Sequence, residues 1–400
     1  MSASSRPIYL DSNATTPVDP QVLAAMLPFF TDYFGNPSSR SHSYGWEADA
    51  GIQIARETIA EAIHAEPIEI IFTSGATEAN NLAIKGVAES YMRDGKHIIT
   101  VQTEHSAVLG PCRYLETLGF SVTYLPVTPD GLVDVTVLEE ALRPDTILVS
   151  VMAANNEIGV LQPLAEIGRL CQRHGILFHV DAAQALGKVP LDVQAMNISL
   201  MSMTAHKLYG PKGVGALYVR RKDPRVQLSP QLHGGKQERG WRSGTLCTPQ
   251  IVGFGEAVRI AMVSMDSDRV RLMGLRDRLS AALLALPGVH LNGHPTQRLP
   301  NNLNISIEGI DITALLSAIR HQVALSSGSA CSSATLQPSH VIQALGRSDA
   351  MAKATLRFGI GRCTTEAEIE TVADVVGKGV RSLRKSDRKS HHKSHHKRHT

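Results

Sequence analysis

The stretch "EIIFTSGATEANNLAIKG" (residues 69–86) passes from an apolar segment through a Ser-Gly-Ala-Thr turn into a helical pattern. The first part is apolar throughout, which predicts a strand buried on both faces of a sheet. The first N–H groups of the following helix have no partner within the helix and form a natural phosphate site. The ordinary alternative is a capping box, with Ser74 or Thr77 as the cap and Glu78 nearby. A strand, a turn and a helix in this order are typical of an α/β fold.

Six more apolar segments follow, and helical stretches lie between most of them. Successive segments begin roughly 20–30 residues apart in most cases, which leaves room for a crossover helix between parallel strands. We therefore predict an α/β fold with a mostly parallel, doubly wound, seven-stranded sheet flanked by helices. The predicted strands are residues 69–74, 97–103, 121–127, 146–153, 176–182, 200–205 and 215–221.

The pattern changes near residue 255 to that of a smaller α+β domain. It predicts an amphipathic helix at 269–286, a strand at 301–309, a helix at 311–322 and a last helix at 366–384. The final residues contain almost no apolar side chains, which predicts disorder. We predict a large domain of residues 16–260, a small domain of residues 1–15 and 261–384, and a disordered, basic, histidine-rich tail at 385–400.

Charge and composition exclude several classes of protein. The formal net charge is +3, but residues 381–400 hold eight Lys/Arg and one Asp, so the other 380 residues sum to −4. We therefore do not expect the folded body to bind nucleic acid. No apolar run approaches the roughly 20 residues that span a membrane. Five unpaired-looking cysteines and the absence of a signal-peptide pattern predict a reducing, cytoplasmic compartment.

Three residues stand out for their chemistry. Lys207 follows a predicted buried strand; burial would lower its pKa, and a neutral lysine amine can form a Schiff base, although an exposed turn lysine is the simpler interpretation. Asp181 ends another predicted strand, where it can hold a proton on a heterocyclic nitrogen or cap a helix. Cys331 lies in "SSGSACSSATLQPS" (326–339), among small polar residues that are unusual around a core cysteine.

These residues are more specific together than apart. A Schiff-base lysine 26 residues after a strand-end aspartate, with a phosphate-binding helix upstream, is the set that a pyridoxal phosphate enzyme needs. At this point the sequence resembles the cysteine desulfurases of the NifS/IscS type, in the class V aminotransferase family of fold-type I enzymes. The resemblance runs from residue 8 to about residue 380. It rests on ten motifs in order: "YLDSNATTPVDP" (9–20), "FGNPSSRSHSYG" (34–45), "FTSGATEANNLAIKG" (72–86), "TEHSAV" (103–108), "NNEIGV" (155–160), "HVDAAQ" (179–184), "AHKLYGPKGVGALYVRR" (205–221), "HGGKQERGWRSGT" (233–245), "SSGSACSS" (326–333) and "LRFGIGR" (356–362).

The resemblance implies a fold-type I, pyridoxal phosphate-dependent homodimer that acts on L-cysteine. It implies that L-alanine is released and that a persulfide forms on Cys331, for iron–sulfur cluster assembly or another sulfur-acceptor protein. Lys207 would carry the cofactor and move the substrate's α-proton, Asp181 would pair with the ring nitrogen, and His105 would stack on the ring as a further catalytic group. The remaining implied cofactor contacts are Ala76, Thr77, Asn156, Gln184, Thr204, His206 and, from the second subunit, Thr245. The implied substrate contacts are Arg357, Asn36 and Asn156, with no resident metal and Cys331 as a possible transient iron–sulfur ligand.

Two residues depart from the family pattern, and two alternative functions remain. Lys236 stands where the family commonly has glycine. Gly359 stands where serine is usual, and we expect the lost hydroxyl to loosen the substrate end around Arg357. One alternative function is a selenocysteine lyase or C–S lyase with the same cofactor. The other is a non-enzymatic sulfur-carrier or iron–sulfur scaffold module.

Overall fold

The computed structural model describes residues 6–327 and 338–396 of the chain. Contacts divide the chain into two compact units. The large unit comprises Thr15–Asn156 and Val160–Asp266. The small unit comprises Met1–Ala14, Glu157–Gly159 and Ser267–Thr400. The three residues Glu157–Gly159 therefore group with the small unit, although sequence alone places them within the large domain.

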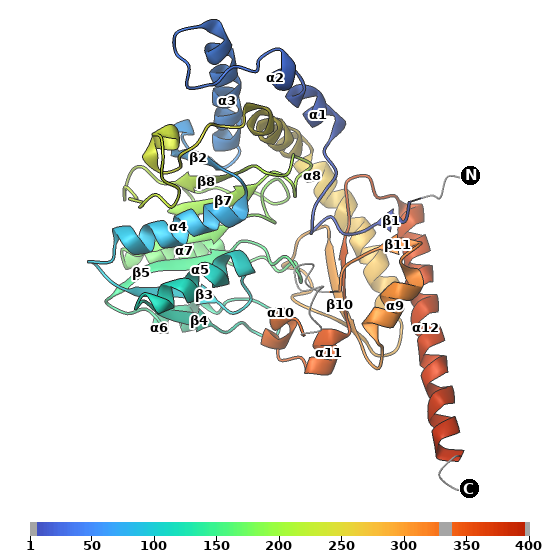
Figure 1. Cartoon of the computed structure of the whole chain (residues 1–400). Helices are drawn as coiled ribbons and strands as arrows, with labels where there is room; N and C mark the ends of the chain where they lie inside the picture. The colour runs from blue at the N-terminus through green and yellow to red at the C-terminus, as the bar shows by residue number, and fades with distance from the viewer. Residues whose placement is uncertain (1–5, 328–337, 397–400) are drawn as a thin grey trace. The chain divides into compact units, whose positions relative to one another are not determined.

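A seven-stranded sheet forms the centre of the large unit (Figure 1). The strand order is β2-β8-β7-β6-β5-β3-β4, and every strand falls within a range predicted from the sequence. The predicted α/β fold is thereby confirmed. The strands are β2 (Ile70–Thr73), β3 (His97–Val101), β4 (Ser121–Leu125), β5 (Thr146–Met152), β6 (Leu177–Asp181), β7 (Leu200–Thr204) and β8 (Gly215–Val219).

Strand direction decides where the functional residues collect. Strand β8 is antiparallel to both of its neighbours, β2 and β7, whereas every other adjacent pair is parallel. Strand β2 therefore points the same way as β7, β6, β5, β3 and β4. The carboxyl ends of these six strands meet at one edge of the sheet, which is where open α/β sheets place their ligands.

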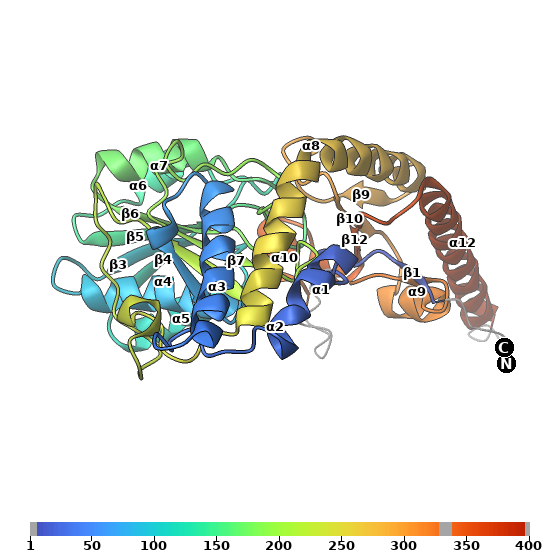
Figure 2. The ribbon, with the colours of Figure 1, turned by 90° about the horizontal axis from the view of Figure 1, so that it is seen from above.

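Helices cover both faces of this sheet (Figure 2). Helices α4 (Ala76–Ser90) and α5 (Ser106–Thr117) lie on one side, and α6 (Val135–Glu140) and α7 (Leu164–Arg173) lie on the other. The apolar faces of α4 and α5 pack on buried strand residues such as Ile98 and Leu148. The other helical segments of the unit are α1 (Pro20–Met26), α2 (Pro28–Thr31), α3 (Ser43–Glu61), η1 (Pro67–Glu69) and η2 (Gln237–Gly240).

The small unit contains an antiparallel three-stranded sheet in the order β12-β10-β9 and a parallel pair, β1 with β11. Leu303, Ile305, Leu356 and Phe358 from its strands are buried in one apolar core. Its strands are β1 (Ile8–Tyr9), β9 (Val289–Leu291), β10 (Asn302–Ile307), β11 (Val323–Ala324) and β12 (Thr355–Gly359). Its helices are α9 (Ile312–Ile319), α10 (His340–Ala344), α11 (Asp349–Lys353) and α12 (Glu366–His396).

Two helices are longer than the sequence pattern indicates. Helix α8 (Thr248–Leu284) begins well before the predicted residue 269, and Pro249 in its first turn suits a helix start. Helix α12 continues to His396, whereas disorder is predicted from residue 385. The segment from 385 to 396 contains neither glycine nor proline, the residues that usually end a helix.

Candidate active site

The predicted cofactor residues of the large unit follow the ends of strands that point the same way. Five strands contribute them, and because their carboxyl ends share one edge of the sheet, the fold brings the set together. The contributions are Ala76 and Thr77 after β2, His105 after β3, Asn156 after β5, Asp181 and Gln184 from β6 and its following turn, and Thr204, His206 and Lys207 from β7 and its following turn.

The start of helix α4 suits an anion. Its N-cap is Gly75, which has no capping side chain, so the capping-box alternative with Ser74 or Thr77 as the cap is not what the structure adopts. A Cβ atom on Gly75 would lie 3.9 Å from Thr204 Oγ1, and one on Gly215 would lie 2.7 Å from the Gly75 Cα atom. Gly215 therefore lets β8 approach the start of α4 closely, and Gly75 adopts a φ of +152° that favours glycine. The predicted phosphate contacts thus lie beside one another.

Positive charge gathers at the end of β7. Burial, together with the charges of Lys207, Lys212 and Lys188, lowers the pKa of His206 to about 4. His206 is therefore a neutral imidazole at pH 7, with its Nδ1 atom 3.1 Å from Thr15 Oγ1. A helix start with three lysines nearby is a suitable environment for a phosphate group.

Asp181 is fixed by two hydrogen bonds at the end of β6. Its Oδ2 accepts from Asn80 Nδ2 at 2.7 Å, and its Oδ1 accepts from the Ala183 N–H at 2.9 Å. Its neighbour Glu104 is fully buried, and burial together with the Asp181 charge holds the pKa of Glu104 well above its usual range. This environment favours the protonated form of Glu104.

His105 and Gln184 are oriented by hydrogen bonds. His105 caps helix α5, and its Nδ1 accepts the Ala107 N–H at 3.1 Å. The ring hydrogen of a neutral His105 therefore belongs on Nε2. Gln184 is 2% exposed, and its Oε1 accepts from Lys188 Nζ at 3.3 Å.

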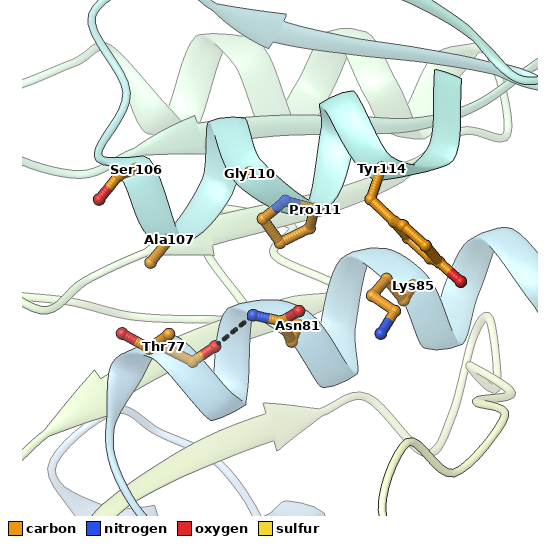
Figure 3. A pocket seen from close by; sticks show the side chains of 8 residues that line it. All are labelled: Thr77, Asn81, Lys85, Ser106, Ala107, Gly110, Pro111 and Tyr114. Carbon is orange, nitrogen blue, oxygen red and sulfur yellow. Dashed lines mark hydrogen bonds between the residues drawn. The ribbon is translucent and has the colours of Figure 1, made fainter. Parts of the chain in front are cut away.

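A pocket of about 370 Å³ adjoins this edge of the sheet, between α4 and α5 (Figure 3). It begins at Thr77 and Ser106 and extends along the two helices to Lys85 and Tyr114. The Lys85 Nζ atom lies 5.1 Å from the centre of the Tyr114 ring. Of the predicted cofactor residues only Thr77 lines this pocket, so it neighbours the predicted site and does not coincide with it.

The small unit holds the predicted substrate arginine. Arg357, in β12, is 2% exposed and pairs through its Nη2 atom with Asp11 Oδ1 at 2.8 Å. Sequence reasoning missed Asp11, although it belongs to the motif "YLDSNATTPVDP". The expectation that Gly359 loosens this end is not supported by the packing, because a Cβ atom there would lie 2.6 Å from the Asn13 backbone nitrogen. That position has no room for a serine.

Two predicted residues of the large unit, Asn36 and Thr245, are exposed. The Asn36 Oδ1 atom accepts the Ser38 N–H at 2.9 Å. Cys331 lies outside the described residues. Within the described residues, no cluster of three or more His, Cys, Asp or Glu could hold a metal ion, and no helix is long and apolar enough to cross a membrane.

Comparison with known proteins identifies the family of the chain. The family profile for class V aminotransferases matches residues 8–372. The chain belongs to this family. It is 54% identical to the cysteine desulfurase IscS of Methylobacillus flagellatus, over 95% of this chain and 93% of that protein. It is 55% identical to a mitochondrial cysteine desulfurase of Arthroderma benhamiae, over 96% of this chain and 76% of that protein.

A solved structure described as a NifS-like protein superimposes with a TM-score of 0.87 at 37% identity, and the match covers 94% of this chain and 99% of that one. These similarities place this class V member with the cysteine desulfurases of the IscS/NifS type and confirm the predicted resemblance. The family is pyridoxal phosphate-dependent and enzymatic, which disfavours the non-enzymatic scaffold alternative.

Proposed function

We propose that the protein converts L-cysteine to L-alanine and leaves the sulfur as a persulfide on Cys331. The observation that carries this proposal is the grouping of Lys207, Asp181 and the uncapped start of α4 at one sheet edge. Bound pyridoxal phosphate would supply an electron sink for a carbanion at the substrate's Cα. Thr204 lies beside the start of α4 at Gly75, and the lysines that act on His206 match the charge of a phosphate.

Side chains of the protein are assigned the remaining binding and proton-transfer roles. Lys207 would hold the cofactor and move the α-proton, and Asp181 would keep a proton on the ring nitrogen. His105 would lie against the ring, and its Nε2–H could donate to the reacting groups. Ala76, Thr77, Thr204 and His206 would hold the phosphate. Asn156 and Gln184 would contact the ring and the substrate.

Arg357 is proposed to bind the substrate carboxylate, with Asn36 and Asn156 as further contacts. Asp11 holds the guanidinium at its Nη2 atom, and the planar fork of an arginine suits the two oxygens of a carboxylate. The Cys331 thiolate then attacks the substrate sulfur, the Cβ–S bond breaks, and alanine leaves after Cβ takes a proton. No resident metal is needed, and Cys331 is a candidate transient iron–sulfur ligand.

The proposed homodimer accounts for exposed apolar side chains on the large unit. Seven large apolar residues between positions 23 and 46 are more than two-fifths exposed, and a second subunit can cover them. The same contact would bring Thr245 to the partner's phosphate. The seven residues are Leu23, Leu27, Phe30, Tyr33, Phe34, Tyr44 and Trp46.

The persulfide sulfur is proposed to pass to an iron–sulfur scaffold or another sulfur-acceptor protein in the cytoplasm. Relatives named IscS and relatives named as mitochondrial enzymes match this chain about equally well, so the compartment rests on the composition of the chain. A selenocysteine lyase or C–S lyase with the same cofactor is the competing activity, and it would need no thiol at position 331.

The test follows L-alanine release and the mass of the Cys331 peptide after the pyridoxal phosphate-loaded protein is mixed with L-cysteine. Cys331→Ser should retain the cofactor and lose alanine release. Lys207→Ala should lose both covalent cofactor attachment and turnover. Cys363→Ser is the matched control, because Cys363 is an exposed cysteine of the same unit. Alanine release at the wild-type rate from Cys331→Ser would favour the lyase.

A further inference from the structure

Ser326 and Ser339 lie on either side of Cys331 in the sequence, and hydrogen bonds fix both of them. The Ser326 carbonyl accepts the Arg357 N–H at 2.9 Å. Ser339 Oγ donates to Glu157 Oε2 at 2.6 Å. Both serines are buried, and their partners Arg357 and Glu157 are only 2% and 1% exposed. The chain on each side of Cys331 is therefore bonded to a buried residue of the small unit.

Glu157 is itself held by the sheet of the small unit. Its carbonyl accepts from Asn302 Nδ2 and Asn304 Nδ2, each at 3.1 Å. Both asparagines lie on β10, the central strand of that sheet. The main chain of Glu157 cannot move away without leaving buried polar groups unpaired, which is costly. Ser339 is thereby attached to a side chain whose own position is fixed.

The Glu157 carboxyl group also interacts with the arginine that the proposed function assigns to the substrate. Arg357 lies opposite Asn304 in the pairing of β12 with β10. Burial raises the pKa of Glu157, whereas the Ser339 hydrogen bond and the charges of His340 and Arg357 lower it. One attachment of the chain around Cys331 is therefore made to the main chain of Arg357, and the other to a carboxyl group that its charge reaches.

The length of the chain makes both attachments relevant to the thiol. Cys331 is five positions after Ser326 and eight before Ser339. An extended chain spans at most about 3.6 Å per residue, so the Cys331 Cα atom lies within about 18 Å of the Ser326 Cα atom. A chain fixed at both ends can place Cys331 in fewer positions than a chain fixed at one end. A larger fraction of those positions can then be suitable for reaction with a substrate held by Arg357.

We propose that Glu157 and Ser339 are positioning residues for sulfur transfer, which fix the chain beyond Cys331 so that its thiolate meets the sulfur of a substrate bound by Arg357. The inference rests on the proposed function, because it takes Cys331 as the attacking group and Arg357 as the substrate contact. In that step the S–S bond forms as the Cβ–S bond breaks, so its rate depends on how the two sulfur atoms are placed. Cofactor binding and α-proton removal do not depend on the position of the thiol.

The experiment compares Ser339→Ala with Ser348→Ala in the pyridoxal phosphate-loaded protein. Each serine caps a five-residue helix of the small unit and accepts a backbone N–H at 3.3 Å, from Ile342 and Met351 respectively. Both variants therefore lose a helix cap, and only Ser339→Ala also loses the bond to Glu157. The two readouts are the rate of L-alanine release at saturating L-cysteine, and the L-cysteine concentration that gives half of the change in cofactor absorbance.

We expect Ser339→Ala to release alanine about tenfold more slowly, because small misplacements of reacting groups cost about one to two orders of magnitude in rate. Its half-saturation concentration should match that of the wild type, since substrate binding needs no thiol. Ser348→Ala should match the wild type in both readouts. Equal rates for the two serine variants, or a tenfold rise in the half-saturation concentration of Ser339→Ala, would overturn the inference.

A double-mutant cycle with Glu157→Ala tests whether Ser339 acts through Glu157. Glu157→Ala removes the carboxyl group but retains the carbonyl that Asn302 and Asn304 bind. In this background Ser339→Ala should slow alanine release no more than Ser348→Ala does. A tenfold effect of Ser339→Ala in both backgrounds would contradict the inference. A wild-type protein that releases alanine but forms no persulfide on Cys331 would instead contradict the proposed function.

Discussion

Glu238 is expected to be the strongest single electrostatic support of the large unit. Its carboxylate binds Arg56 in a two-pronged pair, at 2.9 and 2.7 Å, and Oε2 also accepts the Phe72 N–H at 2.8 Å. The two side chains are only 5% and 3% exposed. Glu238→Gln retains the shape of the side chain but leaves the Arg56 charge buried without compensation. Removing one partner of a buried pair costs about 3–5 kcal/mol, and we expect about 3 here because the amide can still accept hydrogen bonds.

The assay is thermal unfolding followed by tryptophan fluorescence. The chain has two tryptophans, Trp46 and Trp241, and both lie in the large unit, so the signal reports on that unit. A loss of about 3 kcal/mol should lower the midpoint by about 6–12 °C in a unit of this size.

The control is Glu256→Gln, which breaks another two-bond arginine–glutamate pair whose arginine is largely exposed. Glu256 binds Arg259 through two bonds of 2.8 and 2.7 Å, but the arginine side chain is 53% exposed. Exposed pairs contribute between 0 and about 1 kcal/mol, so the midpoint should barely move. Equal midpoints for Glu238→Gln and Glu256→Gln would refute the argument that burial sets the value of the pair.

Two further predictions concern packing and pH. Gly359→Ser should destabilise the small unit and raise the KM for L-cysteine, because the new Cβ would lie 2.6 Å from the Asn13 backbone nitrogen. An unchanged KM would contradict this. Burial lowers the pKa of His179 to about 4 in the folded chain. Below about pH 6.5 the unfolded chain therefore binds a proton at this residue that the folded chain does not bind. The free energy of unfolding should therefore fall as the pH is lowered from about 6.5 to 4, by up to about 1.4 kcal/mol per pH unit from this residue. Urea unfolding of His179→Gln should show a less steep fall over the same range.

The sheet was predictable because its strands are apolar throughout. A segment such as 146–153 can be buried on both faces only in a sheet covered by helices, so its pattern indicates strand type as well as location. Helix α8 shows the limit of the same reasoning. Its amphipathic pattern predicts a start at residue 269, yet the helix begins at Thr248 and passes from one compact unit into the other. The surroundings of α8 change along its length, so its sequence does not show one continuous apolar face.

The grouping of Glu157–Gly159 with the small unit could not be predicted from the sequence either. The Glu157 carbonyl accepts from Asn302 and Asn304, each at 3.1 Å, and its carboxylate accepts from Ser339 Oγ at 2.6 Å. Each bond joins residues more than 140 positions apart. A short polar motif predicts a need for partners, but it carries no information on which distant residues supply them.

The same limit separates the functional residues that sequence reasoning found from those it missed. Lys207 and Asp181 were found because their residue types and positions point to chemistry on a ligand, and Arg357 was found through the family resemblance. Asn80 and Asp11 act on those residues instead: Asn80 holds Asp181 at 2.7 Å, and Asp11 holds Arg357 at 2.8 Å. A buried charge needs a partner, so each found residue implies one that is not yet named. The sequence indicates that a partner is needed, and the distances in the structure identify which side chain it is.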